Sequence, residues 1–438
     1  MKGISEILSK QVSSSLLGLF RIVFGGCLVY EIFYYFNIGV IAKGLKAPVV
    51  LFPYEGFEWI TLLPGKAPEL LLFLSLIAAF CIMLGIIYKY AITFFFFTFT
   101  YFFMLDKGFY NNHLYLFILL CGLMIFMPAD SAYSLAKKNK RTTVPYWTIL
   151  LLRFQLFVVY FYGGLAKINH DWLILKEPVK SIFATQGYSS PLLINFIAYG
   201  GLAFDLSIGF LLCWKPTRKI AVLAVLMFNC TNAVLFHDIG VFPFFMIGAT
   251  MLFFEPDFFE KWLPNTFAND KQKKKMATQN EINTSLSTLH KALIGTYVSL
   301  QLLLPFRCLL ITSNPNWYGP GQRFSWRMKI QNRVEKELSY AIFDMDSKTI
   351  LTFDPHTALT VTQINTLIQD PRMILRFAQF LGDDAHKREM KNVKVKAKVL
   401  ISYNGRTPQL IIDQDKDLLS VTNKGTDIPK WVLPLADE

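Results

Sequence analysis

Charged side chains are scarce in this 438-residue chain. Asp, Glu, Lys and Arg make up only 17% of its residues, whereas 53% are hydrophobic and 16% are aromatic. A soluble chain of this size carries about 25% charged residues. Several windows of roughly 17 to 25 residues are almost free of charge, which is the length that an α-helix needs to cross the hydrocarbon layer. The composition therefore predicts a polytopic α-helical membrane protein.

The sequence also lacks paired cysteines and metal-ligand spacings. Its six cysteines lie in or beside apolar runs, without a Cys-x-x-Cys or Cys/His pattern. We therefore expect neither a disulfide framework nor a metal site, and we interpret the cysteines as small apolar core residues. The first apolar run is too long for a signal-peptide core, so no cleavable signal peptide is expected.

The apolar runs predict about nine membrane spans, with boundaries uncertain by a few residues. They cover residues 15–37, 67–87, 90–105, 112–128, 146–167, 191–214, 219–236, 240–254 and 289–311. The third, fourth and eighth are short, which indicates local bilayer thinning or partial re-entry. The last two spans before residue 260 divide a stretch that is too long for one crossing, with His237 and Asp238 near its middle. The apolar segment 48–60 is short and broken by Pro53 and Gly56, so we interpret it as a re-entrant or surface piece.

Basic residues are concentrated in alternate loops. With a cytoplasmic N-terminus, the inner segments would hold Lys2, Lys10, Lys89, Lys137, Lys138, Lys140, Arg141, Lys215, Arg218, Lys219, Lys271, Lys273, Lys274 and Lys275. The outer loops would hold fewer, so this orientation follows the positive-inside rule. The net charge of +13 is thus a signal of topology, and nucleic-acid binding is not expected. We predict that the C-terminal segment lies outside the cytoplasm.

The hydrophilic C-terminal part predicts a second domain. We divide the chain into a transmembrane catalytic domain, residues 1–311, and an extracytoplasmic α+β domain, residues 312–438. In the latter, strands at 338–343 and 348–353 form a predicted hairpin, and helical patterning over 361–381 is broken by Asp370-Pro371. A strand at 393–401 is followed by an Asn404-Gly405 turn and a partner strand at 409–412.

Three polar groups fall at the outer ends of predicted spans. They are Asn111-Asn112-His113, the stretch from Lys167 to Trp172, and His237-Asp238. Ionisable residues at membrane depth are costly and usually functional. Because the three groups share one membrane face, the pattern predicts an active site that opens outward.

Lys167 has two interpretations. It follows an apolar run that contains Tyr162 and Gly163-Gly164, and Trp172 comes shortly after it. A lysine at such a boundary can extend to water as an interfacial anchor. In a dry aromatic pocket, desolvation can instead lower a lysine pKa by several units and give a neutral amine. Residue chemistry alone favours the anchor.

Several sequence blocks resemble the vitamin K-dependent γ-glutamyl carboxylase family, including its bacterial members with an HTTM-type transmembrane domain. The segment VVYFYGGLAKINHDWL, which contains Lys167, resembles the family signature. The blocks YNNHLY, FDLSIGFLL, HDIGVFPF, WYGPGQRFSWRMK and ISYNGRTPQLIIDQDKDL match in the same order.

This resemblance implies a mechanism and a set of site residues. Reduced vitamin K, a hydroquinone, is deprotonated by the lysine that maps onto Lys167, and the histidine that maps onto His113 assists at the glutamate carbanion. Oxidation by O2 gives the quinone epoxide, and CO2 is added to a glutamate of a peptide or protein substrate, without a metal. The expected quinol-binding residues are Asn112, Tyr162, Gly163, Gly164, Trp172 and His237, and the expected substrate-binding residues are Arg323, Trp326 and Arg406.

For most of these residues, a purely structural role is the alternative to a role in binding or catalysis. His237 could simply be polar in a short outer loop, Arg323 and Trp326 could position the outer domain, and Arg406 belongs first to a hairpin turn. The chain has Ala166-Lys167 where vertebrate enzymes have paired lysines, and its outer part is shorter. We therefore expect a bacterial inner-membrane protein without propeptide-guided carboxylation. The alternatives are a quinol epoxidase or oxidase that does not carboxylate peptides, and a non-enzymatic membrane protein that binds a partner through its outer domain.

Overall fold

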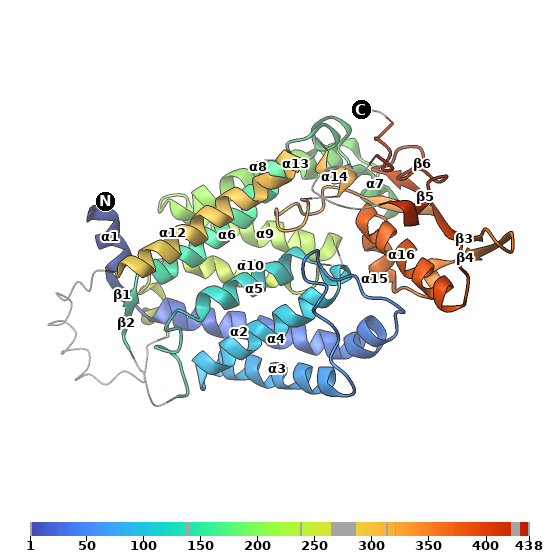
Figure 1. The fold of residues 1–438 in the computed structure, drawn as a ribbon. Coiled ribbons are helices and arrows are strands. Elements are labelled where there is room, and N and C mark those ends of the chain that lie inside the picture. The colour runs from blue at the N-terminus through green and yellow to red at the C-terminus, as the bar shows by residue number, and fades with distance from the viewer. Residues whose placement is uncertain are drawn as a thin grey trace.

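The computed structural model describes residues 2–136, 141–236, 239–263, 286–311, 314–319, 321–421 and 430–436. It consists of a bundle of long apolar helices with a small α+β domain at one end (Figure 1). Helix α1 (Lys2–Ser9) and a short antiparallel pair, β1 (Gln11–Ser13) with β2 (Thr143–Pro145), lie at the opposite end. The N-terminus and the C-terminal domain are therefore separated by the length of the bundle.

Each of the predicted spans corresponds to a helix. Long, apolar helices are α2 (Ser15–Ile38), α3 (Ala67–Leu84), α4 (Tyr88–Leu105), α6 (Trp147–Ala166), α8 (Pro191–Cys213) and α9 (Arg218–Leu235). The stretch Thr288–Leu310 adds a seventh candidate span, built from α12 (Thr288–Leu303), a 3-10 turn (Leu304–Phe306) and α13 (Arg307–Ile311). Helices α5 (Asn112–Met124) and α10 (Phe242–Ala249), the latter extended by a 3-10 turn to Phe253, are shorter. Seven helices in the described part of the chain are thus long enough to cross a membrane, which is fewer than the nine expected.

The division of the long apolar stretch after residue 218 is confirmed. Helix α9 ends at Leu235 and α10 begins at Phe242. The predicted polar residues His237 and Asp238 lie outside the described residues.

Arg21 joins α2 to the C-terminal end of α3 and to the segment after α5. It is fully buried in α2, and its guanidinium donates hydrogen bonds to the carbonyls of Ile82 and Met83 at 2.9 and 2.8 Å. These carbonyls belong to the last turn of α3, where Ile82 O also accepts the Gly85 backbone N–H at 3.1 Å, so Arg21 adds to the capping of this helix end. Further bonds to the carbonyls of Ala129 and Tyr133 fix the chain after α5.

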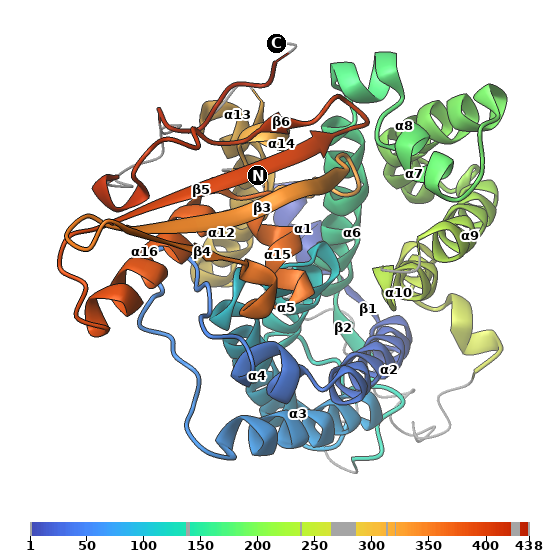
Figure 2. The same ribbon diagram turned by 90° about the vertical axis from the view of Figure 1, so that its right-hand side faces the viewer.

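The C-terminal domain is a four-stranded antiparallel sheet in the order β4-β3-β5-β6, packed against α16. The strands are β3 (Arg333–Asp344), β4 (Thr349–Phe353), β5 (Val393–Tyr403) and β6 (Gln409–Leu410), and the helices are α15 (Val361–Leu367) and α16 (Pro371–Lys387). Both predicted hairpins and the helix break at Pro371 are confirmed. Every second residue of β5 is buried, as expected for a sheet with one covered face. Figure 2 shows the sheet in front of the helix bundle.

Residues of each part enter the hydrophobic core of the other. The segment 48–60 forms an irregular surface loop, and its Phe52 packs into the core of the C-terminal domain beside Phe377. In the other direction, Trp326 is buried in the core of the helix bundle and lies on Tyr115, with ring centroids 4.9 Å apart. This exchange fixes the C-terminal domain over the helix ends.

Candidate functional site

Two of the predicted polar groups meet in one cavity. The cavity has a volume of about 220 Å³, and both Lys167 and His113 line it. Its walls come from the start of α5, the end of α6, α8, α9 and residues 327–329 of the segment before β3. Aromatic and aliphatic side chains, such as Tyr160 and Phe228, supply most of the remaining surface. We call it the lysine cavity.

The Lys167 side chain turns into the protein and is only 8% exposed. Its Nζ donates hydrogen bonds to the Asp205 carboxylate of α8 and to the Gly163 carbonyl, the latter at 3.4 Å. It also lies 5.2 Å from the ring centroid of Trp172, a cation–π contact. An interfacial anchor would extend to water, so this placement disfavours the anchor interpretation.

Asp205 was not identified from the sequence. It is 5% exposed and forms an ion pair with Lys167 in the interior of the bundle. A neighbouring carboxylate stabilises a charged amine, which opposes the effect of desolvation. The signal that could have found Asp205 is a single carboxylate in the apolar run 191–214, because such residues are costly in a membrane.

The two glycines before Lys167 explain how α8 comes so close. A Cβ added at Gly164 would lie 2.8 Å from Leu206 Cγ and 2.9 Å from the Leu206 backbone nitrogen. A Cβ at Gly163 would lie 3.5 Å from Asp205 Oδ2. Neither glycine is among the residues that line the lysine cavity, so they permit close packing of α6 and α8 rather than forming the wall expected for a flat ligand.

His113 lies in the first turn of α5 and lines the lysine cavity together with Lys167. The Asn111 side chain caps this helix and accepts a hydrogen bond from the His113 backbone N–H at 3.3 Å. His113 Nε2 is buried without a hydrogen-bond partner among the described residues, and Glu31 Oε2 of α2 lies 3.5 Å away. Glu31 is a second carboxylate that sequence reasoning missed, although it too stands alone in an apolar run.

The other expected quinol-binding residues fall into three groups. Asn112 and Trp172 line the lysine cavity, and Trp172 Nε1 donates to the Ala198 carbonyl at 2.9 Å. Tyr162 lines a neighbouring cavity of about 330 Å³ instead, and its hydroxyl donates to the Leu302 carbonyl. This position argues against a contact with a ligand beside Lys167. His237 lies outside the described residues.

Arg323 and Trp326, both expected substrate contacts, are engaged within the protein. Arg323 pairs with Asp370 at 2.6 Å, and Trp326 is 1% exposed in the helix-bundle core. Burial alone would raise the pKa of Asp370, but Arg323 and Lys107 outweigh it and lower the pKa to about 2. These two residues join the domains, which supports their structural interpretation.

Arg406 is engaged with the loop that follows Lys167. Its Nη1 and Nη2 donate to the two carboxylate oxygens of Asp171 at 2.9 and 2.6 Å, and Asn404 Nδ2 donates to Oδ2 at 2.6 Å. Burial would raise the pKa of Asp171, but the hydrogen bonds from Arg406 and Asn404 outweigh it and lower the pKa. The positive φ values of Asn404 and Gly405, 48° and 72°, form the tight turn that presents both donors. The hairpin is therefore a clamp on the loop next to Lys167.

Among the described residues, no group of three or more His, Cys, Asp and Glu side chains is arranged to hold a metal ion.

Two family models match the chain. The HTTM domain model matches residues 9–258, and the model of the vitamin K-dependent gamma-carboxylase lumenal domain matches residues 286–438. No solved structure matches the chain.

Proposed function

The chain belongs to the vitamin K-dependent gamma-carboxylase family, and we propose that it couples oxidation of reduced vitamin K by O2 to the addition of CO2 to a glutamate of a peptide or protein. The observation that carries this proposal is the single cavity that holds both Lys167 and His113. Coupled reactions of this kind need the proton-handling groups close together, and the fold brings them from α5 and α6.

The residues of the lysine cavity fit a hydroquinone. The walls are largely apolar and aromatic, and the buried His113 Nε2 makes no hydrogen bond to the described residues, although Glu31 Oε2 lies 3.5 Å away. The volume of about 220 Å³ is below the ~300–1,000 Å³ of pockets that enclose drug-sized ligands. The cavity would therefore enclose only part of the ligand, the ring system, while a hydrocarbon tail would extend into lipid past Gly201 and Asn232, which line the cavity from α8 and α9. When bound, the hydroquinone supplies the reducing equivalents for O2.

Lys167 would accept a proton from a ring hydroxyl in this cavity as the neutral amine, after the proton of its ion pair with Asp205 has left the amine. Asp205 would orient the amine and stabilise the ammonium that proton transfer creates, as a carboxylate does for the imidazolium of a Ser–His–Asp triad. His113, with Glu31 beside it, is a second site where a proton can be held. Removal of a general base of this kind typically lowers the rate by about 10²- to 10⁴-fold.

We further propose that the N-terminus is cytoplasmic and that the C-terminal domain lies on the opposite side of the membrane. The separation of the two at opposite ends of the bundle supports this orientation (Figure 1). The lysine cavity would then open toward the extracytoplasmic side, where a peptide substrate can reach it, in a bacterial inner membrane.

The test compares Lys167→Ala with Lys180→Ala, a variant of an exposed lysine in the same outer region. Purified protein in lipid nanodiscs receives reduced vitamin K, O2, labelled bicarbonate and a glutamate-containing peptide. We expect the wild type and Lys180→Ala to form epoxide and to fix label into the peptide, and Lys167→Ala to lose both activities by at least ~10²-fold.

The other outcomes separate the alternatives. Epoxide without fixed label would identify a quinol epoxidase that does not carboxylate this peptide. Absence of quinol turnover in the wild type would reject both enzyme functions and leave a binding protein.

A further inference from the structure

Glu31 is a buried carboxylate in the middle of an apolar helix. It belongs to α2, a candidate membrane span, and it is 3% exposed. Cys27 and Tyr35, one turn before it and one turn after it, are also buried, and neither side chain is charged near neutral pH. An isolated ionised carboxylate is strongly disfavoured in such surroundings. Glu31 therefore needs either a cation or a proton.

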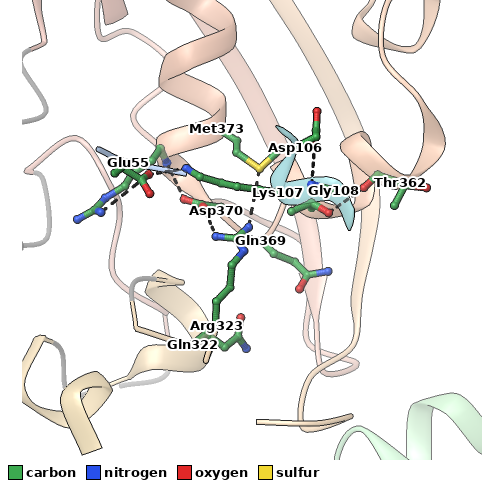
Figure 3. Close-up of polar contacts among 12 residues, drawn as sticks. Glu55, Asp106, Lys107, Gly108, Gln322, Arg323, Thr362, Gln369, Asp370 and Met373 are labelled. Carbon is green, nitrogen blue, oxygen red and sulfur yellow. Dashed lines mark hydrogen bonds and ion pairs between the residues drawn. The ribbon is translucent and has the colours of Figure 1, made fainter. Parts of the chain in front are cut away.

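The partner of Glu31 differs in kind from those of other buried carboxylates. Asp370 pairs with Arg323, as Figure 3 shows, and an arginine keeps its charge in proteins. Glu31 Oε2 instead lies 3.5 Å from His113 Nε2, and Glu31 forms no other ion pair with a described residue. An imidazole is charged only when it holds a second proton. The charge of Glu31 is thus linked to a proton on His113.

The imidazole of His113 is held in one orientation. Its ring centroid lies 5.8 Å from that of Phe117 and 6.3 Å from that of Phe242. A Cβ added at Gly240 would lie 4.0 Å from His113 Cε1, so the backbone there closes a further side of the ring. Nε2 is buried on the side of Glu31, while His113 lines the lysine cavity. Nδ1 is therefore the nitrogen that is left to meet a ligand in this cavity.

The other charges around the lysine cavity oppose a positive charge on His113. Three basic residues share the cavity wall with it, namely Lys167, Arg327 and Lys329. Asp205 is the other acidic residue among the described lining residues, and it is ion-paired with Lys167. Because like charges disfavour protonation, an imidazolium at this position needs a carboxylate of its own. Glu31 is the described carboxylate that lies beside it.

On the basis of the proposed carboxylase function, we propose that Glu31 is a positioning residue for His113. Its carboxylate holds one proton on Nε2 and stabilises a second proton on Nδ1, so His113 presents a charged N–H donor to the lysine cavity. The carboxylate and the imidazolium together are neutral, which reduces the cost of burying each of them. A cation fixed at the wall of the cavity stabilises negative charge as it develops on a bound group.

The test reads the charge of His113 directly, so it does not depend on turnover. Full-length protein with isotope-labelled histidine is placed in lipid nanodiscs at neutral pH. The ring-nitrogen NMR signals of His113 are identified by their loss in His113→Gln. We expect an imidazolium in the wild type and in Glu31→Asp, which keeps the carboxylate, and a neutral imidazole in Glu31→Gln. The control Glu58→Gln removes an exposed carboxylate in the loop before α3 and should leave these signals unchanged.

Turnover supplies a second readout. A charged donor forms a hydrogen bond about twice as strong as that of a neutral donor. We therefore expect Glu31→Gln to lower kcat about 10-fold, with little change in the KM for the hydroquinone. Glu31→Asp should lose less activity than Glu31→Gln. A packing role predicts the opposite order, because Gln preserves the size of Glu and Asp does not.

The outcomes are distinct from those of the proposed function. The same charge on His113 in the wild type and in Glu31→Gln would overturn the proposal, as would a greater loss of kcat in Glu31→Asp than in Glu31→Gln. A wild type with an imidazolium that depends on Glu31, but without quinol turnover, would retain the pair and reject the carboxylase function. Turnover with a neutral His113 would retain that function and reject the pair.

Discussion

The clamp between Arg406 and Asp171 allows a quantitative prediction about how the C-terminal domain supports the lysine cavity. Both side chains are largely buried, with 14% and 13% of their surface exposed, and two hydrogen bonds join them. Removing one partner of a fully buried ion pair costs about 3–5 kcal/mol, whereas an exposed pair contributes about 0–1 kcal/mol. Asn404 would remain on Asp171 after the loss of Arg406. We therefore expect Arg406→Ala to lower the free energy of unfolding by about 2–3 kcal/mol.

The same change should act on the lysine cavity. Asp171 directly precedes Trp172, whose ring lies 5.2 Å from Lys167 Nζ. A loosened loop would misplace this ring, so we expect kcat for quinol oxidation to fall more than the KM for the peptide rises. Arg406→Lys keeps the charge but cannot bind both oxygens in the same way, and it should show about half of the loss in stability.

A double-mutant cycle measures the interaction directly. Unfolding of Arg406→Ala, Asp171→Ala and the double variant is followed in detergent micelles by tryptophan fluorescence, and we expect a coupling energy of about 1–2 kcal/mol. The control is Arg388→Ala, which removes an exposed Arg–Asp pair at the C-terminal end of α16 and should change stability by no more than about 0.5 kcal/mol. A coupling energy below about 0.5 kcal/mol for Arg406 and Asp171 would refute the clamp.

Two further predictions concern packing and pH. Gly164→Ala should destabilise the protein by about 1–3 kcal/mol, because the new methyl group would clash with the Leu206 backbone. The control is Gly200→Ala, where a Cβ meets nothing within 4 Å, and it should leave stability unchanged. Equal thermal stability of the two variants would contradict close packing of α6 and α8 at Gly164. Asp370 has a folded-state pKa of about 2, below its unfolded value of ~3.9. The ionised carboxylate therefore contributes about 2–3 kcal/mol to the free energy of unfolding above pH ~4, and this contribution is lost as the pH falls toward 2. Asp370→Asn should therefore flatten stability over this acid range, and an unchanged pH profile would show that Arg323 does not stabilise the carboxylate.

The helices and hairpins could be predicted because their signals are local. Uninterrupted apolar runs are long enough to require helices, since lipid offers no partner to backbone polar groups. The Asn404-Gly405 turn and the break at Asp370-Pro371 likewise depend on the residues at those positions. The number of spans was less well predicted, because α5 and α10 are apolar but shorter than a membrane crossing.

The sequence by itself also predicted that Lys167 and His113 belong to one active site. Both lie at the ends of predicted spans, and both lie in blocks that resemble the family. Only the tertiary structure decided what surrounds them. Asp205 lies 38 residues from Lys167 in the chain, and it reaches the amine because α8 packs closely against Gly164. Arg406 lies 235 residues from Asp171, and in the structure its guanidinium is hydrogen-bonded to the Asp171 carboxylate. Such pairings depend on how helices and domains pack together, and no local sequence pattern specifies that packing. The helices themselves could be predicted because each one depends on an apolar run that is local in the sequence.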